Sequence, residues 1–463
     1  SLYTNFTQCT MISKSATYRA LSLLGADFNT ISDAYISNTL GNAAYFDTGS
    51  DRNAVMSSTM ISNGTNLYAL TIVNSSSNTI VDSYVQGSTA AYITGSTGTV
   101  IGGSVLVATN TTGGALTLTA GSVNLTLSSS VLLGGTSGYA VYLNIGRNGL
   151  FNLSTNTIRG GRAGIYVVYG STILGAVTQV WVTSNTILGS VGTGMDRYGI
   201  FLKGLKVGAT VQNNAIYYRN SGTLGVSSAY AFYVRSSSGV VFENNRINNP
   251  GMVTGGSFYG AYLSDAHMMR FKFNDIHSTA PALTNAFVMR LGELSNYLTL
   301  KHNIFASSFT APTTSSGTLF LADTVSQTGM VSNYNTFFSS NAKLGFKWTV
   351  GAEGLVAWRT ASSKDGQSIS MDPKWFSVAG NEEDFHPLSG AGRYDTVTQS
   401  FVTDTAQSPS IDAGDPASFC GNEPAPNGGR INMGAYGNTP EASKSAPGAA
   451  SAGLLVTAAA AST

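Results

Sequence analysis

The sequence is poor in charge and has no long apolar run. Only 10% of its 463 residues are charged, and the formal net charge is +1. A near-neutral chain lacks the basic excess with which proteins hold nucleic acids or anionic membrane surfaces. No apolar stretch approaches the ~20 residues of a membrane-spanning helix. We therefore expect no nucleic-acid partner and no membrane span.

Cysteine is almost absent. Cys9 and Cys420 stand near opposite ends of the chain, so neither a disulfide framework nor a metal site built on paired cysteines is expected. Serine, threonine, asparagine and glycine supply polarity in place of charge, which suits a secreted protein. No signal peptide precedes "SLYTNF", which indicates a processed or truncated chain. We expect a monomer at an extracellular or cell-surface location.

A repeat runs through most of the chain. Asparagine followed two residues later by Ile, Val or Phe, with degenerate copies, recurs at intervals of 20 to 32 residues. The copies stand at Asn29, Asn53, Asn78, Gly98, Asn124, Asn156, Asn185, Asn214, Asn245, Asn274, Asn303 and Asn335. A repeat of this length indicates a solenoid. Because it is rich in Thr, Val, Tyr and Ser, each repeat is expected to consist of strands.

A second motif lies between successive asparagines, in forms such as "AVYL", "GIYV" and "AFYV". Each repeat thus holds at least two short strands separated by turns, which is the plan of a parallel β-helix. Asparagine tolerates the left-handed backbone of a tight corner, and stacked asparagines can hydrogen-bond along the axis. We predict an all-β, right-handed parallel β-helix of about 12 coils over residues 1–338. A C-terminal cap over 339–443 and an Ala/Ser-rich tail over 444–463 follow it.

The C-terminal part carries a resemblance to a known group. The stretches "SISMDPKWFSVAGNEEDFHPLSGAGRYD", "SPSIDAGDPA" and "NGGRINMGAYGNTPEAS" resemble the C-terminal block of bacterial secreted right-handed β-helix proteins. The repeats resemble the pectate-lyase-like superfamily more generally. That resemblance implies a right-handed coil and work on polysaccharides. Three short signatures of that superfamily, Asn-Thr-Asp, Gly-His-Gly and Arg-Ile-Lys, are missing here.

Strand alternation sorts the second motif into an aliphatic core face and an outward face. The outward face stacks an aromatic column, in which we expect a polysaccharide to bind at Tyr166, Phe201, Tyr233, Tyr262 and Phe320. Two residues further on, a polar column is predicted to include Lys203, Arg235 and Arg290. Rings beside polar groups suit a sugar polymer. The alternative is that a loop covers the tyrosines, which then form a lateral core.

Charges concentrate between Asp196 and Asp323, and two chemistries fit them. In β-elimination on a uronic-acid polymer, a base removes a proton while cations neutralise the carboxylate. In glycoside hydrolysis, two carboxylates flank the scissile bond. The candidate catalytic residues are Lys203 as base, Arg235 and Arg290 as clamps, and Asp265 with Asp323 as the carboxylate pair assisted by His267.

Two functions therefore stay open at this point. One is an extracellular polysaccharide lyase or glycoside hydrolase, and the other is a non-catalytic adhesin, surface or polysaccharide-binding protein. No cofactor is required by either, although calcium could bind through Glu243 and Asp275, since carboxylate oxygens are its usual ligands.

Overall fold

A computed structural model describes most of the chain. The described residues are 3–119, 121–170, 178–190, 194–206, 208–219, 222–223, 227–250, 253–254, 256–279, 285–292, 294–307, 316–321, 323–341, 344–348, 351–352 and 354–445.

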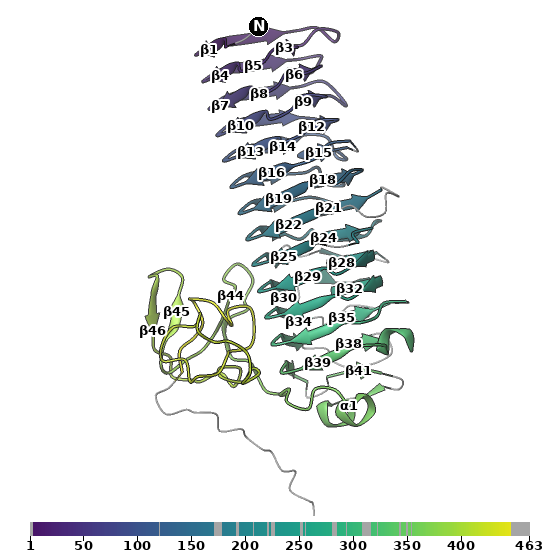
Figure 1. Cartoon of the computed structure of the whole chain (residues 1–463), viewed down its shortest axis with the longest axis vertical. Coiled ribbons are helices and arrows are strands. Elements are labelled where there is room, and N and C mark those ends of the chain that lie inside the picture. Colours follow the sequence, from purple (N-terminus) through teal and green to yellow (C-terminus); the bar gives the residue numbers. More distant parts are fainter. Residues whose placement is uncertain are drawn as a thin grey trace, which may run out of the picture.

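The described chain winds into a right-handed parallel β-helix with three long sheets (Figure 1). Each coil contributes one strand to each sheet in turn, and successive coils pair these strands in parallel. Only the last strand of sheet 3 among the described residues, β42, pairs antiparallel, with β41. Sheets 1 and 2 hold 13 strands each, and sheet 3 holds 14. The prediction of about 12 coils of short strands is confirmed.

The strand bounds follow the order of the coils. Sheet 1 contains β1 (Asn5–Thr7), β4 (Thr30–Ser32), β7 (Ala54–Met56), β10 (Thr79–Val81), β13 (Val100–Gly102), β16 (Leu125–Ser128), β19 (Leu150–Ser154), β22 (Gln179–Thr183), β25 (Ala209–Gln212), β29 (Val241–Glu243), β33 (Arg270–Lys272), β36 (Thr299–Lys301) and β39 (Val331–Asn333). Sheet 2 contains β2 (Thr10–Ser13), β5 (Tyr35–Asn38), β8 (Thr59–Ser62), β11 (Tyr84–Gly87), β14 (Val105–Ala108), β17 (Val131–Leu133), β20 (Thr157–Arg159), β23 (Thr186–Leu188), β26 (Ala215–Tyr217), β30 (Arg246–Pro250), β34 (Asp275–Thr279), β37 (Ile304–Ser307) and β40 (Thr336–Ser339).

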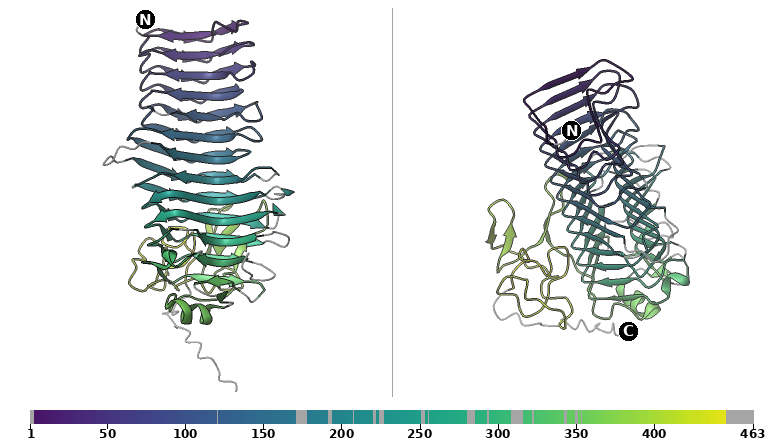
Figure 2. Two further views of the ribbon diagram at one scale, coloured as in Figure 1. Left: turned by 90° about the vertical axis from the view of Figure 1, so that its right-hand side faces the viewer. Right: turned by 45° about the horizontal axis from the view of Figure 1, so that its top comes forward.

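Sheet 3 is the broadest and faces the viewer in the left panel of Figure 2. It contains β3 (Leu21–Leu24), β6 (Ala44–Asp47), β9 (Tyr68–Val73), β12 (Thr89–Thr94), β15 (Leu116–Leu118), β18 (Tyr139–Ile145), β21 (Ala163–Tyr169), β24 (Arg197–Lys203), β28 (Ser228–Ser238), β32 (Ser257–His267), β35 (Asn285–Leu291), β38 (Ser316–Leu321), β41 (Phe346–Lys347) and β42 (Gly351–Ala352). Small two-stranded sheets pair β27 (Gly222–Thr223) with β31 (Val253–Thr254), β43 (Trp375–Ser377) with β44 (Asp384–Pro387), and β45 (Arg393–Asp395) with β46 (Ser400–Val402).

The interior is filled by inward side chains, one in the shortest strands and two or more in the longer ones, each stacked on its counterpart in the next coil. In sheet 1, for example, Val211, Phe242, Phe271 and Leu300 are all fully buried and pair in register. The rings of Phe242 and Phe271 stack with their centroids 4.4 Å apart. Each such side chain stabilises the fold by about 1.5–3 kcal/mol, so a narrow core is sustained by repetition.

The asparagine repeat forms two ladders at two different corners. Asn29, Asn53 and Asn78 lie at the corner before sheet 1. The asparagines from Asn156 to Asn335 lie at the next corner, between sheets 1 and 2. The prediction of a single series is therefore wrong. Serines occupy the second ladder in the earlier coils, namely Ser58, Ser83, Ser104 and Ser130.

The second ladder satisfies buried polar groups from coil to coil. Asn245 is fully buried, and its Nδ2 donates to Asn274 Oδ1 at 2.9 Å and to the Val211 carbonyl at 2.8 Å. Its own Oδ1 accepts the backbone N–H and the side-chain amide of Asn214, each at 3.0 Å. An amide at this position therefore links neighbouring coils in both directions, as the sequence predicted.

The C-terminal part divides into an end piece and a lateral block. Helix α1 (Leu355–Ser362) covers the last coil, where Trp358 is fully buried and stacks on Phe346 at 4.9 Å. A short 3-10 helix, η1 (Val325–Gln327), precedes it. The residues from 372 to 445, here called the C-terminal block, fold back along the side of the β-helix instead of covering its end (Figures 1 and 2). None of the helices in the described ranges is long and apolar enough to cross a membrane.

Replacing Asn245 by alanine is expected to lower the free energy of unfolding by about 3 kcal/mol, because the Asn214 N–H and the Val211 carbonyl lose their buried partner. Asn245→Ser should cost about half as much, since a hydroxyl at this ladder position still accepts an N–H bond. Chemical denaturation measures both. The exposed Asn63→Ala serves as the control, and equal stability of Asn63→Ala and Asn245→Ala would contradict the role of the ladder.

Candidate functional site

The outward face of sheet 3 carries the aromatic column that the sequence predicted. Strand register places Tyr142, Tyr166, Phe201, Tyr233 and Tyr262 directly beside one another in successive coils. The column continues through Arg290 to the backbone of Phe320, whose side chain lies outside the described residues. Threonines interrupt its N-terminal half at Thr71 and Thr117. A continuous ring surface therefore spans only the middle coils.

A second aromatic column lies three residues before the first and was missed by the alternation rule. It consists of Tyr139 and, after a gap at Ala163, of Tyr198, Tyr230, Tyr259 and Phe287. Sheet 3 bends between the two columns, so that two successive side chains are buried there. Small residues permit the bend: a Cβ on Gly199 would lie 2.7 Å from the Ala231 carbonyl oxygen, and one on Gly260 would lie 2.5 Å from that of Val288.

The rings of the two columns pack on each other. Between the columns, Tyr230 stacks on Tyr233 at 4.9 Å. Within them, Tyr166 and Phe201 stack at 4.2 Å, and Tyr230 stacks on Tyr259 at 4.8 Å with an angle of 8° between the rings. Phe201 is only 4% exposed, and Tyr259 and Phe287 are also buried. Because stacked rings cover each other's faces, solvent meets mainly their edges and hydroxyls. The aromatic face of sheet 3 is thus buried around Tyr259 and Phe287, where it forms a lateral core. It is partly exposed at Tyr166, Tyr198 and Tyr233, which together are called the open strip.

The tyrosine hydroxyls of the open strip are hydrogen-bond donors. Burial raises the pKa of Tyr166, Tyr198 and Tyr233 above the ordinary value, with neighbouring tyrosines adding to the effect. The hydroxyls therefore stay protonated at any ordinary pH. A row of such donors can meet oxygen atoms of a ligand.

Two unpaired cations stand next to the strip. Lys203 and Arg235 pair in register on adjacent coils, about 4.8 Å apart. Both side chains are exposed, and among the described residues no carboxylate lies within ion-pair distance of either. Ser264 follows Arg235 in the same column. The predicted juxtaposition of Lys203 and Arg235 is confirmed.

Asp265 and His267 adjoin the cations. Asp265 follows Ser264, the register partner of Arg235, and its backbone is left-handed (φ 51°). His267 Nε2 lies 3.1 Å from Asp265 Oδ1, and His267 Nδ1 lies 2.8 Å from Asn296 Oδ1. Both ring nitrogens are thus engaged, whereas Asp265 Oδ2 has no partner among the described residues. Proton exchange with a ligand would therefore fall to Asp265.

Two other candidates are not brought to this place. Arg290 pairs with Tyr262, so its predicted position in the polar column is wrong; Gly292 takes that place two residues later. The Arg290 guanidinium packs 5.3 Å from the Phe287 ring centroid and 5.6 Å from the Tyr262 ring centroid. Asp323 caps η1: its Oδ1 accepts the Ser326 N–H at 2.8 Å, and its Oδ2 accepts the Leu294 N–H at 3.2 Å.

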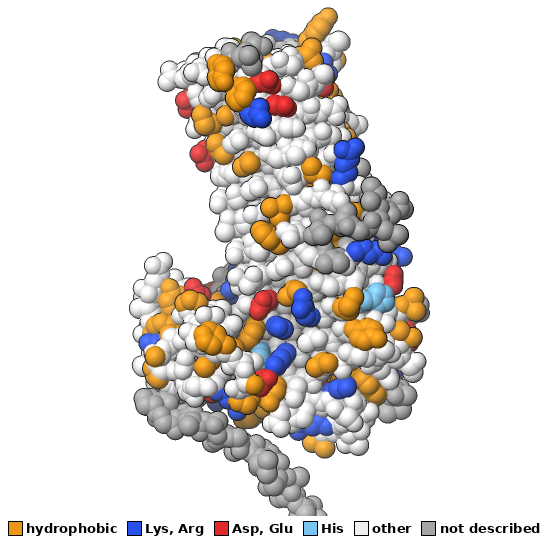
Figure 3. All heavy atoms as spheres, in the orientation of Figure 1, with side chains coloured by type: hydrophobic (Ala, Val, Ile, Leu, Met, Phe, Trp, Pro, Cys, Tyr) orange, Lys and Arg blue, Asp and Glu red, His pale blue; other side chains and the backbone are white. Residues whose placement is uncertain are grey.

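The remaining charges of the sequence cluster lie on another side of the molecule, where they hold the C-terminal block. In Figure 3 charged side chains gather in the lower half of the β-helix, beside this block. Arg219 pairs with Glu383 at 2.6 Å, and Lys301 pairs with Asp415 at 2.6 Å. His302 Nε2 accepts the Asp415 backbone N–H at 3.0 Å. The density of charge in this stretch thus reflects two separate surfaces.

The proposed calcium ligands are not brought together. Glu243 ends a strand of sheet 1 and pairs in register with Gln212 and Lys272. Asp275 begins a strand of sheet 2, is buried, and accepts the Ala435 N–H at 3.0 Å. Burial raises the pKa of Asp275 well above its usual range. Throughout the described part of the chain, no three His, Cys, Asp or Glu side chains form a metal-binding group.

Comparison with known proteins bears on the fold. A family model described as "Right handed beta helix region" matches residues 175–362, which end at α1 and exclude the C-terminal block. A solved structure of a tailspike double mutant of E. coli bacteriophage HK620, in complex with a pentasaccharide, is 10% identical with a TM-score of 0.43. That likeness covers 78% of this chain and 70% of the tailspike chain. No curated protein matches the sequence. The superfamily resemblance and that of the C-terminal block stay predictions.

Acid is expected to weaken the docking of the C-terminal block through His302. Burial, with the nearby charge of Lys301, lowers the pKa of His302 from 6.5 to about 3. The unfolded chain takes up this proton first as the pH falls. The contribution of His302 to the free energy of unfolding is therefore fully present above its ordinary pKa of 6.5. It is lost as the pH falls toward the folded-state pKa of about 3.

Denaturation of the unmodified protein and of His302→Gln at about pH 7 and about pH 4 measures this contribution. The unmodified protein should lose more free energy of unfolding between the two values, by up to about 3 kcal/mol. Parallel pH profiles for the two proteins would contradict it.

Proposed function

We propose that the protein is an extracellular polysaccharide-binding β-helix that holds an acidic glycan across sheet 3. The observation that carries this proposal is the Lys203–Arg235 pair, two exposed cations in adjacent coils without a carboxylate partner in the described structure. Like charges this close repel each other. An anionic group between them relieves that repulsion and gains charge-assisted hydrogen bonds.

The tyrosine strip extends this site along the axis of the β-helix. Successive coils are about 4.8 Å apart, so the partly exposed Tyr166, Tyr198 and Tyr233 present hydroxyls from three neighbouring coils beside the cations, over the buried ring of Phe201. A linear polymer with regularly spaced carboxylates and hydroxyls fits a surface with a regular repeat. Since neighbouring rings occupy the ring faces, the polymer would meet hydroxyls and ring edges, in contrast to a sugar stacked flat on one exposed ring.

Cleavage of the bound glycan is a second proposal, favoured by the Asp265–His267 pair. In a β-elimination on a uronic acid, Asp265 Oδ2 accepts the C5 proton, the C4–C5 double bond forms and the C4–O bond breaks. The departing oxygen takes a proton from water, and the hydroxide that remains takes the proton held by Asp265, which restores the base. Lys203 and Arg235 would stabilise the charge that develops on the uronate carboxylate. Hydrolysis by Asp265 with Asp323 fits less well, because both oxygens of Asp323 already accept hydrogen bonds.

Removal of either cation is expected to weaken binding of polygalacturonate by about ten- to a hundredfold, because a charge-assisted hydrogen bond of about 1.5–3 kcal/mol is lost. Lys203→Ala and Arg235→Ala are compared with Lys14→Ala, an exposed lysine in the first coil. Binding should fall with added salt. The proposal fails if the unmodified protein binds polygalacturonate no better than neutral dextran.

Asp265→Asn is expected to reduce turnover of an acidic polysaccharide by a factor of about 10² to 10⁴ without weakening binding. Asparagine tolerates the left-handed backbone at this position. Asp33→Asn is the matched control, since Asp33 is exposed and also left-handed with φ 52°. Unsaturated products are followed by ultraviolet absorbance and new reducing ends by a colorimetric assay. If neither appears while binding persists, the protein is a non-catalytic binder.

A further inference from the structure

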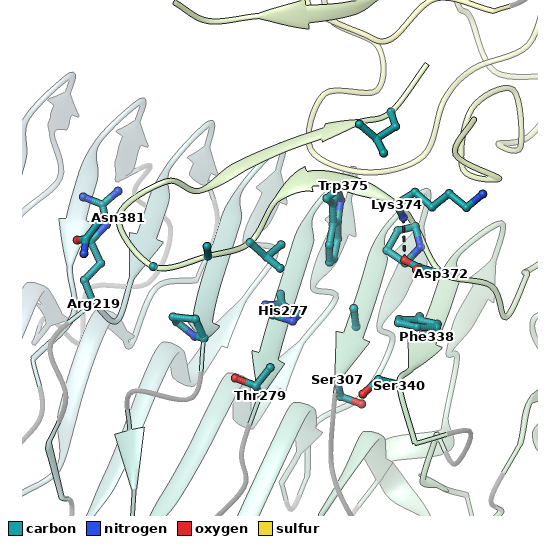
Figure 4. A pocket seen from close by; sticks show the side chains of 17 residues that line it. Arg219, His277, Thr279, Ser307, Phe338, Ser340, Asp372, Lys374, Trp375 and Asn381 are labelled. Atoms are coloured by element: carbon teal, nitrogen blue, oxygen red, sulfur yellow. Dashed lines mark hydrogen bonds between the residues drawn. The ribbon is translucent and has the colours of Figure 1, made fainter. Parts of the chain in front are cut away.

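A recess lies between sheet 2 and the C-terminal block, on different strands from the Lys203–Arg235 pair (Figure 4). Strands β30, β34, β37 and β40 form its floor, and the segment from Asp372 to Asn381 forms its opposite wall. Its volume is about 810 Å³. Recesses of about 300–1,000 Å³ hold small organic ligands, so this cleft is large enough for one or two sugar rings.

The floor offers hydrogen-bonding groups on rigid strands. Asn248 Nδ2 donates to the Val378 carbonyl at 3.0 Å, which fixes the orientation of its amide. Asn248 Oδ1 must then accept from His277 Nδ1, 2.7 Å away. His277 Nε2 is left as an acceptor without a partner in the described structure. Thr279 and Ser307 line the same floor, and Ser307 Oγ is buried without a hydrogen-bond partner among the residues that the structure describes.

The walls of the cleft are apolar. Trp375 descends from the C-terminal block toward His277, and Phe338 lies on the floor beyond it (Figure 4). The indole meets Phe385 at 71° and His277 at 75°. These contacts are edge-to-face, and the described structure places no ring parallel to the indole. A flat apolar surface is thus combined with hydrogen-bonding groups on the floor.

The charges around the cleft cancel. Glu383 neutralises Arg219 across a distance of 2.6 Å. Asp372 and Lys374 stand together at the rim with opposite charges. His277 is uncharged, because burial lowers its pKa to about 4. The lining therefore attracts neither anions nor cations, in contrast to the Lys203–Arg235 pair on sheet 3.

We propose that this cleft is a second carbohydrate site, which binds an uncharged mono- or disaccharide unit. A pyranose has an apolar face, which suits an indole, and a rim of hydroxyls, which suits His277 Nε2 and the hydroxyl groups of the floor. The absence of net charge selects a neutral sugar over a uronate. This site uses different strands from the sheet 3 surface and does not depend on its function.

Saturation-transfer NMR with cellobiose, maltose, lactose and di-N-acetylchitobiose tests the proposal on the full chain. At least one of these neutral disaccharides should bind, and digalacturonate should not compete for the cleft. Ala379→Trp places a bulky side chain at the exposed mouth and should abolish binding, whereas Ala417→Trp, an exposed site of the same block outside the cleft, should not. Thr279→Val should weaken binding several-fold.

Two results would overturn the proposal. One is no saturation transfer to any of the four disaccharides at about 10 mM, a concentration that fills even a site of millimolar affinity. The other is binding that survives both Ala379→Trp and Thr279→Val. The double variant Lys203→Ala/Arg235→Ala separates the two sites, because it removes only binding of polygalacturonate. Failure of the acidic site would leave the result for neutral sugars unchanged.

Discussion

Hydrogen bonding in register between successive coils is the constraint on which the rest of the structure depends. Most strands are short and bond only to the neighbouring coils, so no coil could hold its shape without the coil above and below it. The buried amide of Asn245 serves the same purpose at a corner, where the strands leave polar groups unmatched. Fixed register makes residues from neighbouring repeats adjacent. The Lys203–Arg235 pair exists only because of this adjacency.

Much of this arrangement could be predicted from the sequence, because it follows from local alternation and repeat length. The column from Tyr142 to Tyr262 and the neighbouring cations needed only the rule that outward residues lie two apart. Tyr198 and Tyr230 escaped that rule because the strand bends before Phe201 and Tyr233. A bend formed by one small residue leaves a weak trace in the sequence.

The two asparagine ladders could not be separated by their motif. Each asparagine precedes a strand whose second residue points inward, whether the corner leads into sheet 1 or into sheet 2. Arg290 was misplaced for a related reason: its column depends on strand register, which "AFVMR" alone does not define. Both errors concern the position of a residue within its coil, whereas the β-helix itself was predicted from the repeat length.

The charged stretch was interpreted as one cluster because its residues are close in sequence. Their partners are distant: Glu383 lies 164 residues from Arg219, and Asp415 lies 114 from Lys301. Proximity along a coiled chain mixes residues of all three sheets. Only the three-dimensional structure shows which charges serve the candidate site and which serve the docking of the C-terminal block.

The folded-back block also changes how the rod responds to force. It is fastened to β26, β30, β34, β36 and β40 by side-chain contacts spread along the axis. Separating two of these neighbouring coils would have to break these side-chain contacts as well as the hydrogen bonds between the paired strands. We therefore expect the C-terminal third of the β-helix to resist bending and to unfold more slowly under force. Among the described residues, these side-chain contacts reach only the later coils, so the earlier coils lack this additional support.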